Sequence, residues 1–180
     1  MESRVHEVRL RDGRSAIFAE KEVLGLDEVS SVVGGLSNWA DSFALASWVD
    51  AEAHALSYGL GMEEAIDQKA DCNPAVGLSV LGYSYVIGIF SSEEIVRHCR
   101  TNEAFAALSG RKFLFRQELT LFRRRHRPLL IELIGRVFVR AVCEWYGVGR
   151  TDVAPYIESH LRRMAVERLD IARHLDTVDE

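Results

Sequence analysis

Twenty-one consecutive residues, Cys72 to Ser92 (CNPAVGLSVLGYSYVIGIFSS), carry no charge, although 27% of all residues in the chain are charged. Their number is close to the roughly 20 residues that a membrane-spanning helix needs. However, the run includes an asparagine, a proline, four serines and three glycines, and no basic cluster precedes it. We therefore expect a helix buried in a protein core, beginning at Asn73-Pro74, where proline sacrifices no helical hydrogen bond.

The length and the helix signals predict a mainly α, multi-helix fold. The 180 residues suit one compact domain, within which we distinguish an acidic hairpin and helical lead-in (1–72), a helical domain (73–150) and an amphipathic C-terminal helix (151–180). Asp12-Gly13 favours a two-residue turn, which predicts a short β-hairpin near residues 5–19. The expected helices cover about residues 39–58, 62–69, 74–88, 92–100, 103–108, 115–126, 128–146 and 156–175.

Capping signals set several of these boundaries. Ser91 and Glu94 have the spacing of a capping box, and Asn102 is a favourable cap for the next short helix. Ser109-Gly110 ends that helix with a tight turn. The three short helices between residues 92 and 126 fit a helix-turn-helix unit, whose last helix would enter the major groove of DNA.

Charge is distributed unevenly along the chain. Residues 1–88 hold 14 acidic and 6 basic side chains, residues 89–150 hold 6 and 12, and residues 151–180 hold 7 and 4, within a net charge of −5. A basic centre is typical of a surface that faces a polyanion, but an acidic flank could equally dock on it within the same molecule.

The basic centre includes the run FRQELTLFRRRHRPLL, Phe115 to Leu130. On a helix it separates into a packing row, expected to hold Phe115, Leu119, Phe122 and His126, and a basic face of Arg116, Thr120, Arg123, Arg124 and Arg127 with Gln117 beside it. An exposed helix can be charged merely for solvation. Here, however, only Glu118 could form ion pairs along the helix, and Arg111 and Lys112 add charge in the preceding turn. Phosphate contact is the competing interpretation.

Several short motifs follow one another between residues 73 and 130. They are Asn73-Pro74, Tyr83 to Ile89 (YSYVIGI), Ser91-Ser92 with Ile95, Ala104-Phe105 with Leu108 and Gly110, and Phe122-Arg123 with His126. In order and spacing they resemble the N-terminal domain of DDE insertion-sequence transposases. The usual Pro-Asp-x-x-Thr entry to the arginine helix is replaced by Leu114 to Glu118, and the first 72 residues match only loosely. The resemblance implies a helical domain that binds the inverted repeats of the element or supports transposase assembly.

We therefore expect a non-catalytic protein that binds double-stranded DNA. Its candidate contacts are Arg111, Lys112, Arg116, Gln117, Thr120, Arg123, Arg124 and Arg127. The alternative is a protein-interaction module or regulator that pairs with itself or with a full-length transposase, for which the 156–175 helix is the candidate interface.

Catalysis and cofactors are not expected. No nucleotide-binding, hydrolase or zinc-protease motif occurs, and the 33 residues after Gly147 predict one amphipathic helix rather than a nuclease domain. The three cysteines are widely spaced, which favours free thiols over a disulfide framework or zinc site. The charged opening MESRVHEVRLRD is unlike a signal peptide, so we expect a cytoplasmic protein with no membrane segment.

Overall fold

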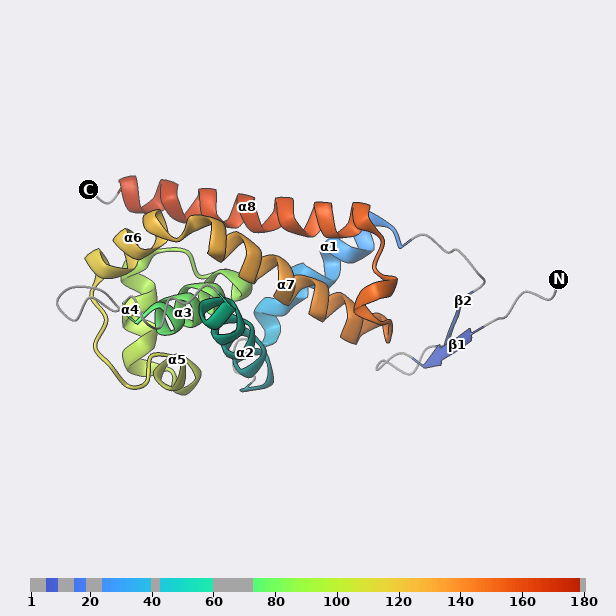
Figure 1. Cartoon of the computed structure of the whole chain (residues 1–180), viewed down its shortest axis with the longest axis horizontal. Helices are drawn as coiled ribbons and strands as arrows, with labels where there is room; N and C mark the ends of the chain where they lie inside the picture. The colour runs from blue at the N-terminus through green and yellow to red at the C-terminus, as the bar shows by residue number, and fades with distance from the viewer. Residues whose placement is uncertain (1–5, 10–14, 19–23, 40–42, 60–72, 179–180) are drawn as a thin grey trace.

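The computed structural model describes residues 6–9, 15–18, 24–39, 43–59 and 73–178, with side chains for 24–39, 43–59 and 73–176. The chain is mainly α-helical, as predicted (Figure 1). Its described helices are α1 (Leu26–Gly34), the 3-10 helix η1 (Gly35–Trp39), α2 (Phe43–Gly59), α3 (Pro74–Ile87), α4 (Ser92–Thr101), α5 (Glu103–Leu108), α6 (Arg116–Arg125), α7 (Arg127–Tyr146), the 3-10 helix η2 (Arg150–Asp152) and α8 (Pro155–Val178).

Two short strands precede the helices. β1 (His6–Arg9) and β2 (Ser15–Phe18) pair antiparallel, with His6 opposite Phe18 and Arg9 opposite Ser15. The turn predicted at Asp12-Gly13 lies outside the described residues, and so does the helix predicted at 62–69. Both stay predictions.

Helix α3 lies in the core, as the uncharged run predicts. All of its side chains from Gly77 to Ile87 are buried. The Asn73 side chain accepts a hydrogen bond from Ala75 N at 2.9 Å, and the helix ends where Gly88 adopts φ 90°. Within the described residues, no single helix has the length and apolar composition of a membrane span; α3 and α4 reach them only together, across a 103° bend.

Two glycines let neighbouring helices approach α3 closely. A Cβ added at Gly77 would lie 2.6 Å from the Phe122 ring of α6, and one added at Gly82 would lie 2.5 Å from Leu133 of α7. Distances below 3 Å are too short for a Cβ, so a larger residue at either position would force the neighbouring side chain to move. The Leu133 methyl is the end of a flexible side chain, whereas the Phe122 ring is rigid. These contacts bring α6 and α7 against the central helix.

The C-terminal helix α8 packs over α7 (Figure 1). Leu161, Ala165, Leu169 and Ala172 follow one side of α8 at helical spacing, and all four are fully buried. Much of the apolar side predicted for residues 156–175 therefore packs within the chain, whereas Leu175 and Ile171 are 38% and 46% exposed. Pairing of this helix with a second copy stays a prediction.

Arg168 anchors α8 to the ends of two other helices. Its guanidinium donates to the carbonyl oxygens of Tyr85 and Val86 (2.8 Å for Val86) at the end of α3, and to that of Val33 in α1 at 3.5 Å. Carbonyl groups in the last turn of a helix have no partner within it, so the half-buried guanidinium of Arg168 satisfies carbonyl groups at the end of α3.

The start of α4 corrects the predicted capping box. Ser91 is the N-cap residue, but its side chain makes no capping hydrogen bond. Glu94 instead pairs with Arg97 at 3.2 Å. The amide of Ser92 donates to the carboxylate of Asp176 at 3.3 Å, so an acidic side chain from α8 satisfies a free amide in the first turn of α4.

Helix α2 also begins differently from its prediction. Trp39, predicted near its start, belongs to η1, and the described helix begins at Phe43. Ala46, Val49 and Ala53 are buried, whereas Phe43 is 61% exposed.

Candidate nucleic-acid interface

Helix α6 turns a different side to the core from the one that its sequence predicts. Leu119, Thr120, Phe122 and Arg123 are buried, whereas Phe115 is 63% exposed. At 3.6 residues per turn, the buried side is rotated by roughly 50° from the predicted packing row. The structure thus corrects two candidate contacts, because the buried side chains of Thr120 and Arg123 cannot belong to an exposed DNA surface.

Arg123 lies in a buried polar cluster, which we define as Tyr85, Ser92, Thr120, Arg123 and Asp176. The side chain of Arg123 is 5% exposed and that of Asp176 is 2% exposed. The guanidinium pairs with the Asp176 carboxylate and donates to the Tyr85 hydroxyl at 3.1 Å. Ser92 and Thr120 donate to the same carboxylate at 2.7 and 2.9 Å. The cluster thereby joins α3, α4, α6 and α8.

Electrostatics hold this cluster in one protonation state. Burial by itself raises the pKa of Asp176, but the hydrogen bonds from Arg123, Ser92 and Thr120 outweigh it and hold the pKa below its ordinary value. Burial raises the pKa of Tyr85 to about 12. No buried side-chain nitrogen or oxygen of the described residues lacks a hydrogen-bond partner. The cluster is a closed structural network with no open polar group for a ligand.

A second contact brings the acidic C-terminal segment onto the arginine run. Arg127 pairs with Asp170 of α8 at 3.2 Å, with both side chains half-buried. Asp170 also lies 3.5 Å from Arg173 of its own helix. Arg123 and Arg127 are therefore both neutralised by α8. Docking of the acidic flank within the same molecule, left open by the sequence, takes place at these two residues.

The turn between α5 and α6 displays the remaining basic residues. Arg111 and Lys112 are exposed. The amide of Arg111 donates to Ala106 O at 2.8 Å and that of Gly110 to Ala107 O at 3.0 Å, the pattern of a Schellman motif. Both Gly110 (φ 60°) and Arg111 (φ 56°) are left-handed. The short helix α5 thus ends as predicted, at Ser109-Gly110, and places Arg111 on the surface.

Arg100 joins these two residues, although the sequence did not single it out. Arg100, Arg111 and Lys112 line one pocket of about 240 Å³ between α4, α5 and the turn. No carboxylate from the described part of the chain pairs with Arg100, Arg111, Lys112 or Arg116. Arg100 was missed because it is separated from the turn by α5 and comes near it only through the fold.

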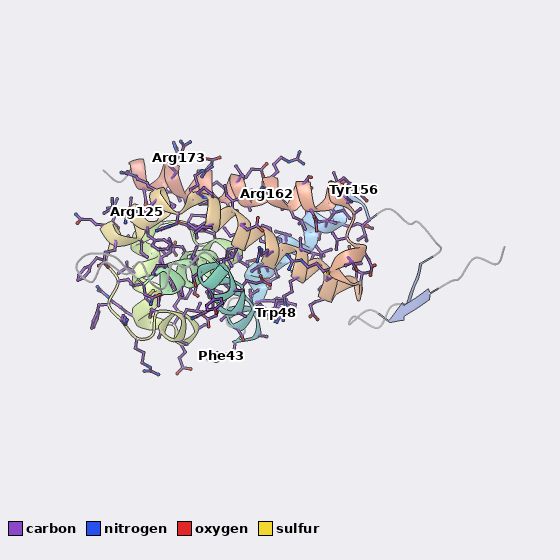
Figure 2. The ribbon with its side chains drawn as sticks, viewed as in Figure 1. Phe43, Trp48, Arg125, Tyr156, Arg162 and Arg173 are labelled. Atoms are coloured by element: carbon purple, nitrogen blue, oxygen red, sulfur yellow. The ribbon has the colours of Figure 1, made fainter. Side chains whose placement is uncertain are left out.

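The exposed side of α6 carries the other candidates. Gln117, Arg124 and Arg125 are exposed, and Arg116 is half-buried. Arg125 was not among the predicted contacts; Figure 2 places it at the same end of the molecule as Arg173. Glu118 caps the helix by accepting from Phe115 N at 2.9 Å. Its carboxylate therefore has a structural role at the start of α6.

Two exposed phenylalanines accompany the basic turn. Phe113 is 77% exposed and Phe115 is 63% exposed, and Leu121 on α6 is 60% exposed. Large exposed apolar side chains in one region are typical of interaction surfaces. The turn and α6 thus combine positive charge with apolar surface.

The described residues contain no arrangement suited to a metal, and the two cysteines among them, Cys99 and Cys143, are poor nucleophiles. No group of three or more His, Cys, Asp or Glu side chains is placed to hold a metal ion in the described ranges. Burial raises the pKa of Cys99 to about 11 and also raises that of Cys143, so both thiols stay protonated at neutral pH. Neither cysteine has the properties of a catalytic thiolate.

Comparisons with family models, with curated proteins and with solved structures found no match to this chain.

Proposed function

We propose that this chain is a non-catalytic DNA-binding protein that contacts the duplex through the basic turn and the exposed side of α6. The contact surface comprises Arg100, Arg111, Lys112, Arg116, Gln117, Arg124 and Arg125. The observation that carries the proposal is the convergence of Arg100, Arg111 and Lys112 on one pocket, without an acidic partner from the described residues. Three such charges suit phosphate oxygens, because each contact releases condensed counterions from DNA.

The order of the helices supports the same proposal. Helices α4, α5 and α6 follow one another in the order of a helix-turn-helix-like unit, with Asn102 alone between α4 and α5 and residues 109–115 between α5 and α6. In this proposal α6 approaches the groove with Gln117 and Arg124, since Thr120 and Arg123 face the core. The resemblance to transposase N-terminal domains suggests inverted repeats as the target and a bacterial cytoplasmic setting.

Binding of a fluorescently labelled 20-bp duplex of random sequence tests the proposal. Removal of Arg111 and Lys112 together, by Arg111→Ala/Lys112→Ala, is expected to weaken binding about tenfold at low salt. Both side chains are exposed, so the fold should be retained. The matched control is Arg150→Ala/Arg163→Ala, which removes the same charge at two exposed positions of η2 and α8. Equal loss in the two variants would show a general charge effect and defeat the proposal.

A second candidate function is association with another protein through Phe113, Phe115 and Leu121. The observation that favours it is their exposure, which exceeds half of each side chain. If a second copy of the chain covers them, light scattering will show a dimer that Phe113→Ser/Phe115→Ser converts to a monomer. A monomer at all concentrations before substitution would exclude self-association through this patch.

A further inference from the structure

An aromatic pocket lies between α1, η1 and the C-terminal end of α7. It has a volume of about 440 Å³, within the range of small-molecule sites. Figure 1 shows that α1 and this end of α7 lie away from α4, α5 and α6, which carry the basic surface. The pocket is therefore a separate feature of the molecule, and its role does not depend on DNA binding.

The pocket wall combines aromatic rings with one negative charge. Trp39, Trp145 and Tyr146 line it, together with Glu28, and no lysine or arginine does so. Trp145 is 48% exposed, so its ring lies at the opening rather than in the core. Burial, and next to it the charge of Glu28, raise the pKa of Tyr146, in keeping with a carboxylate close to this ring.

The rings beside the pocket already attract a cation. Trp39 packs against Trp48 with ring centroids 5.8 Å apart, and the guanidinium of Arg140 lies 4.8 Å from the Trp48 centroid. That contact is a cation–π interaction. It uses Trp48, which does not line the pocket, and leaves the pocket-lining rings to a ligand.

The chemistry of the wall selects among ligand classes. An anion would be repelled by Glu28. A small, strongly hydrated metal ion would find a single carboxylate where it needs several oxygen ligands. A neutral apolar molecule would contact the aromatic walls but would gain no attraction from the charge of Glu28, which is an exposed residue. An ammonium group with apolar substituents satisfies both the rings and the carboxylate.

We propose that this pocket binds an organic cation, specifically an ammonium group that carries methyl or other apolar substituents. The faces of the aromatic rings contact the substituents and attract the positive charge of the ammonium group. Glu28 balances that charge. Glu28 also has a structural role, since its Oε2 accepts from Gly25 N at 3.2 Å at the start of α1.

Choline and 3,3-dimethylbutan-1-ol provide a matched pair of probes, because they have the same shape and differ by the positive charge. Binding to the full chain is measured by calorimetry or by NMR shifts of the tryptophan indole protons. We expect choline to bind at least tenfold more tightly than the neutral alcohol. Equal affinity for the two probes, or no binding of choline up to tens of millimolar, would overturn the proposal.

Three variants locate the binding site. Glu28→Gln removes the charge but keeps an oxygen that can cap α1. Trp145→Leu removes an aromatic ring that is half exposed. Each substitution should weaken choline binding about fivefold. Phe43→Leu, at an exposed aromatic residue on α2 that does not line the pocket (Figure 2), should leave choline binding unchanged. Circular dichroism establishes that each variant is folded. If Glu28→Gln and Trp145→Leu bind choline as the unsubstituted protein does, the cation is not held in this pocket.

Discussion

Arg111 and Arg123 belong to the same basic stretch of sequence but occupy opposite environments. Arg111 lies on an exposed turn in a left-handed conformation, with no carboxylate partner among the described residues. Arg123 is buried and is paired with Asp176 inside a closed hydrogen-bond network. A run of like charges can therefore contain both fold-stabilising and ligand-facing residues. The two kinds differ in burial and in their ion-pair and hydrogen-bond partners, and not in charge.

The difference originates in α8. This helix brings Asp176 to Arg123 and Asp170 to Arg127, and it also places Arg168 on the carbonyl ends of α3 and α1. The side of α6 that faces α8 therefore stabilises the fold. The turn before α6, which holds Arg111 and Lys112, makes none of these contacts. The predictions below separate the two environments.

The largest effect is expected from breaking the buried pair. Asp176→Ala leaves the Arg123 guanidinium buried and unpaired, which should lower the free energy of unfolding by about 3–5 kcal/mol. Glu167→Ala, at an exposed acidic residue of the same helix, should change it by less than about 0.5 kcal/mol. Urea unfolding at pH 7 measures both. Similar losses in the two variants would mean that the cluster contributes no more to stability than a surface residue.

The pH dependence of stability sharpens the contrast. Hydrogen bonds, chiefly from Arg123, hold the pKa of Asp176 below its ordinary value, against the effect of burial. The folded state therefore binds this proton less well than the unfolded state, whose aspartate pKa is about 3.9. The stabilisation is fully present above about pH 4 and is lost as the pH falls through the lower folded value.

Comparison with Asp176→Asn isolates this contribution, since all other carboxyl groups titrate in both proteins. The difference in unfolding free energy between the unsubstituted chain and Asp176→Asn should be largest at neutral pH and should shrink as the pH falls below about 4. A difference that stays constant down to pH 2 would contradict the assigned role of the Asp176 charge.

The smallest effect is expected at the exposed turn. Arg111→Gly relieves a left-handed backbone conformation at φ 56°, so it should raise the free energy of unfolding by about 0.5–1 kcal/mol while weakening DNA binding. Lys112→Gly, at the neighbouring position without a positive φ, should be neutral or slightly destabilising. Thermal unfolding of the two variants checks the sign; destabilisation by Arg111→Gly would show that the side chain is needed for the fold.

The sequence predicted features that depend on neighbouring residues. Asn73 and Asn102 cap their helices through hydrogen bonds to amides two or three positions ahead, and Gly147 ends α7 in a left-handed conformation. The mainly α class and the buried α3 follow from local pattern as well. Such features need only the residues that surround them.

Features that depend on distant residues were not predicted. A helical pattern assigns arginine to the exposed side of a helix. No residue close to Arg123 in the sequence indicates that Asp176 pairs with it in the core. The same carboxylate displaced the predicted cap at Ser91. Arg100 joins Arg111 in one pocket only after α5 reverses the chain direction. Each case involves a tertiary contact that local periodicity does not contain.

The salt dependence of DNA binding tests the division of roles most directly. Each phosphate contact contributes about 0.9 to the magnitude of the negative slope of log K against log salt concentration, a magnitude that we call the salt slope. Arg111→Ala/Lys112→Ala should therefore lower the salt slope by about 1.8. Arg123→Met/Asp176→Leu, which replaces the buried pair with apolar side chains and so limits the loss of stability, should leave the salt slope unchanged. A lower salt slope for the buried-pair variant, or an unchanged one for the turn variant, would contradict the account.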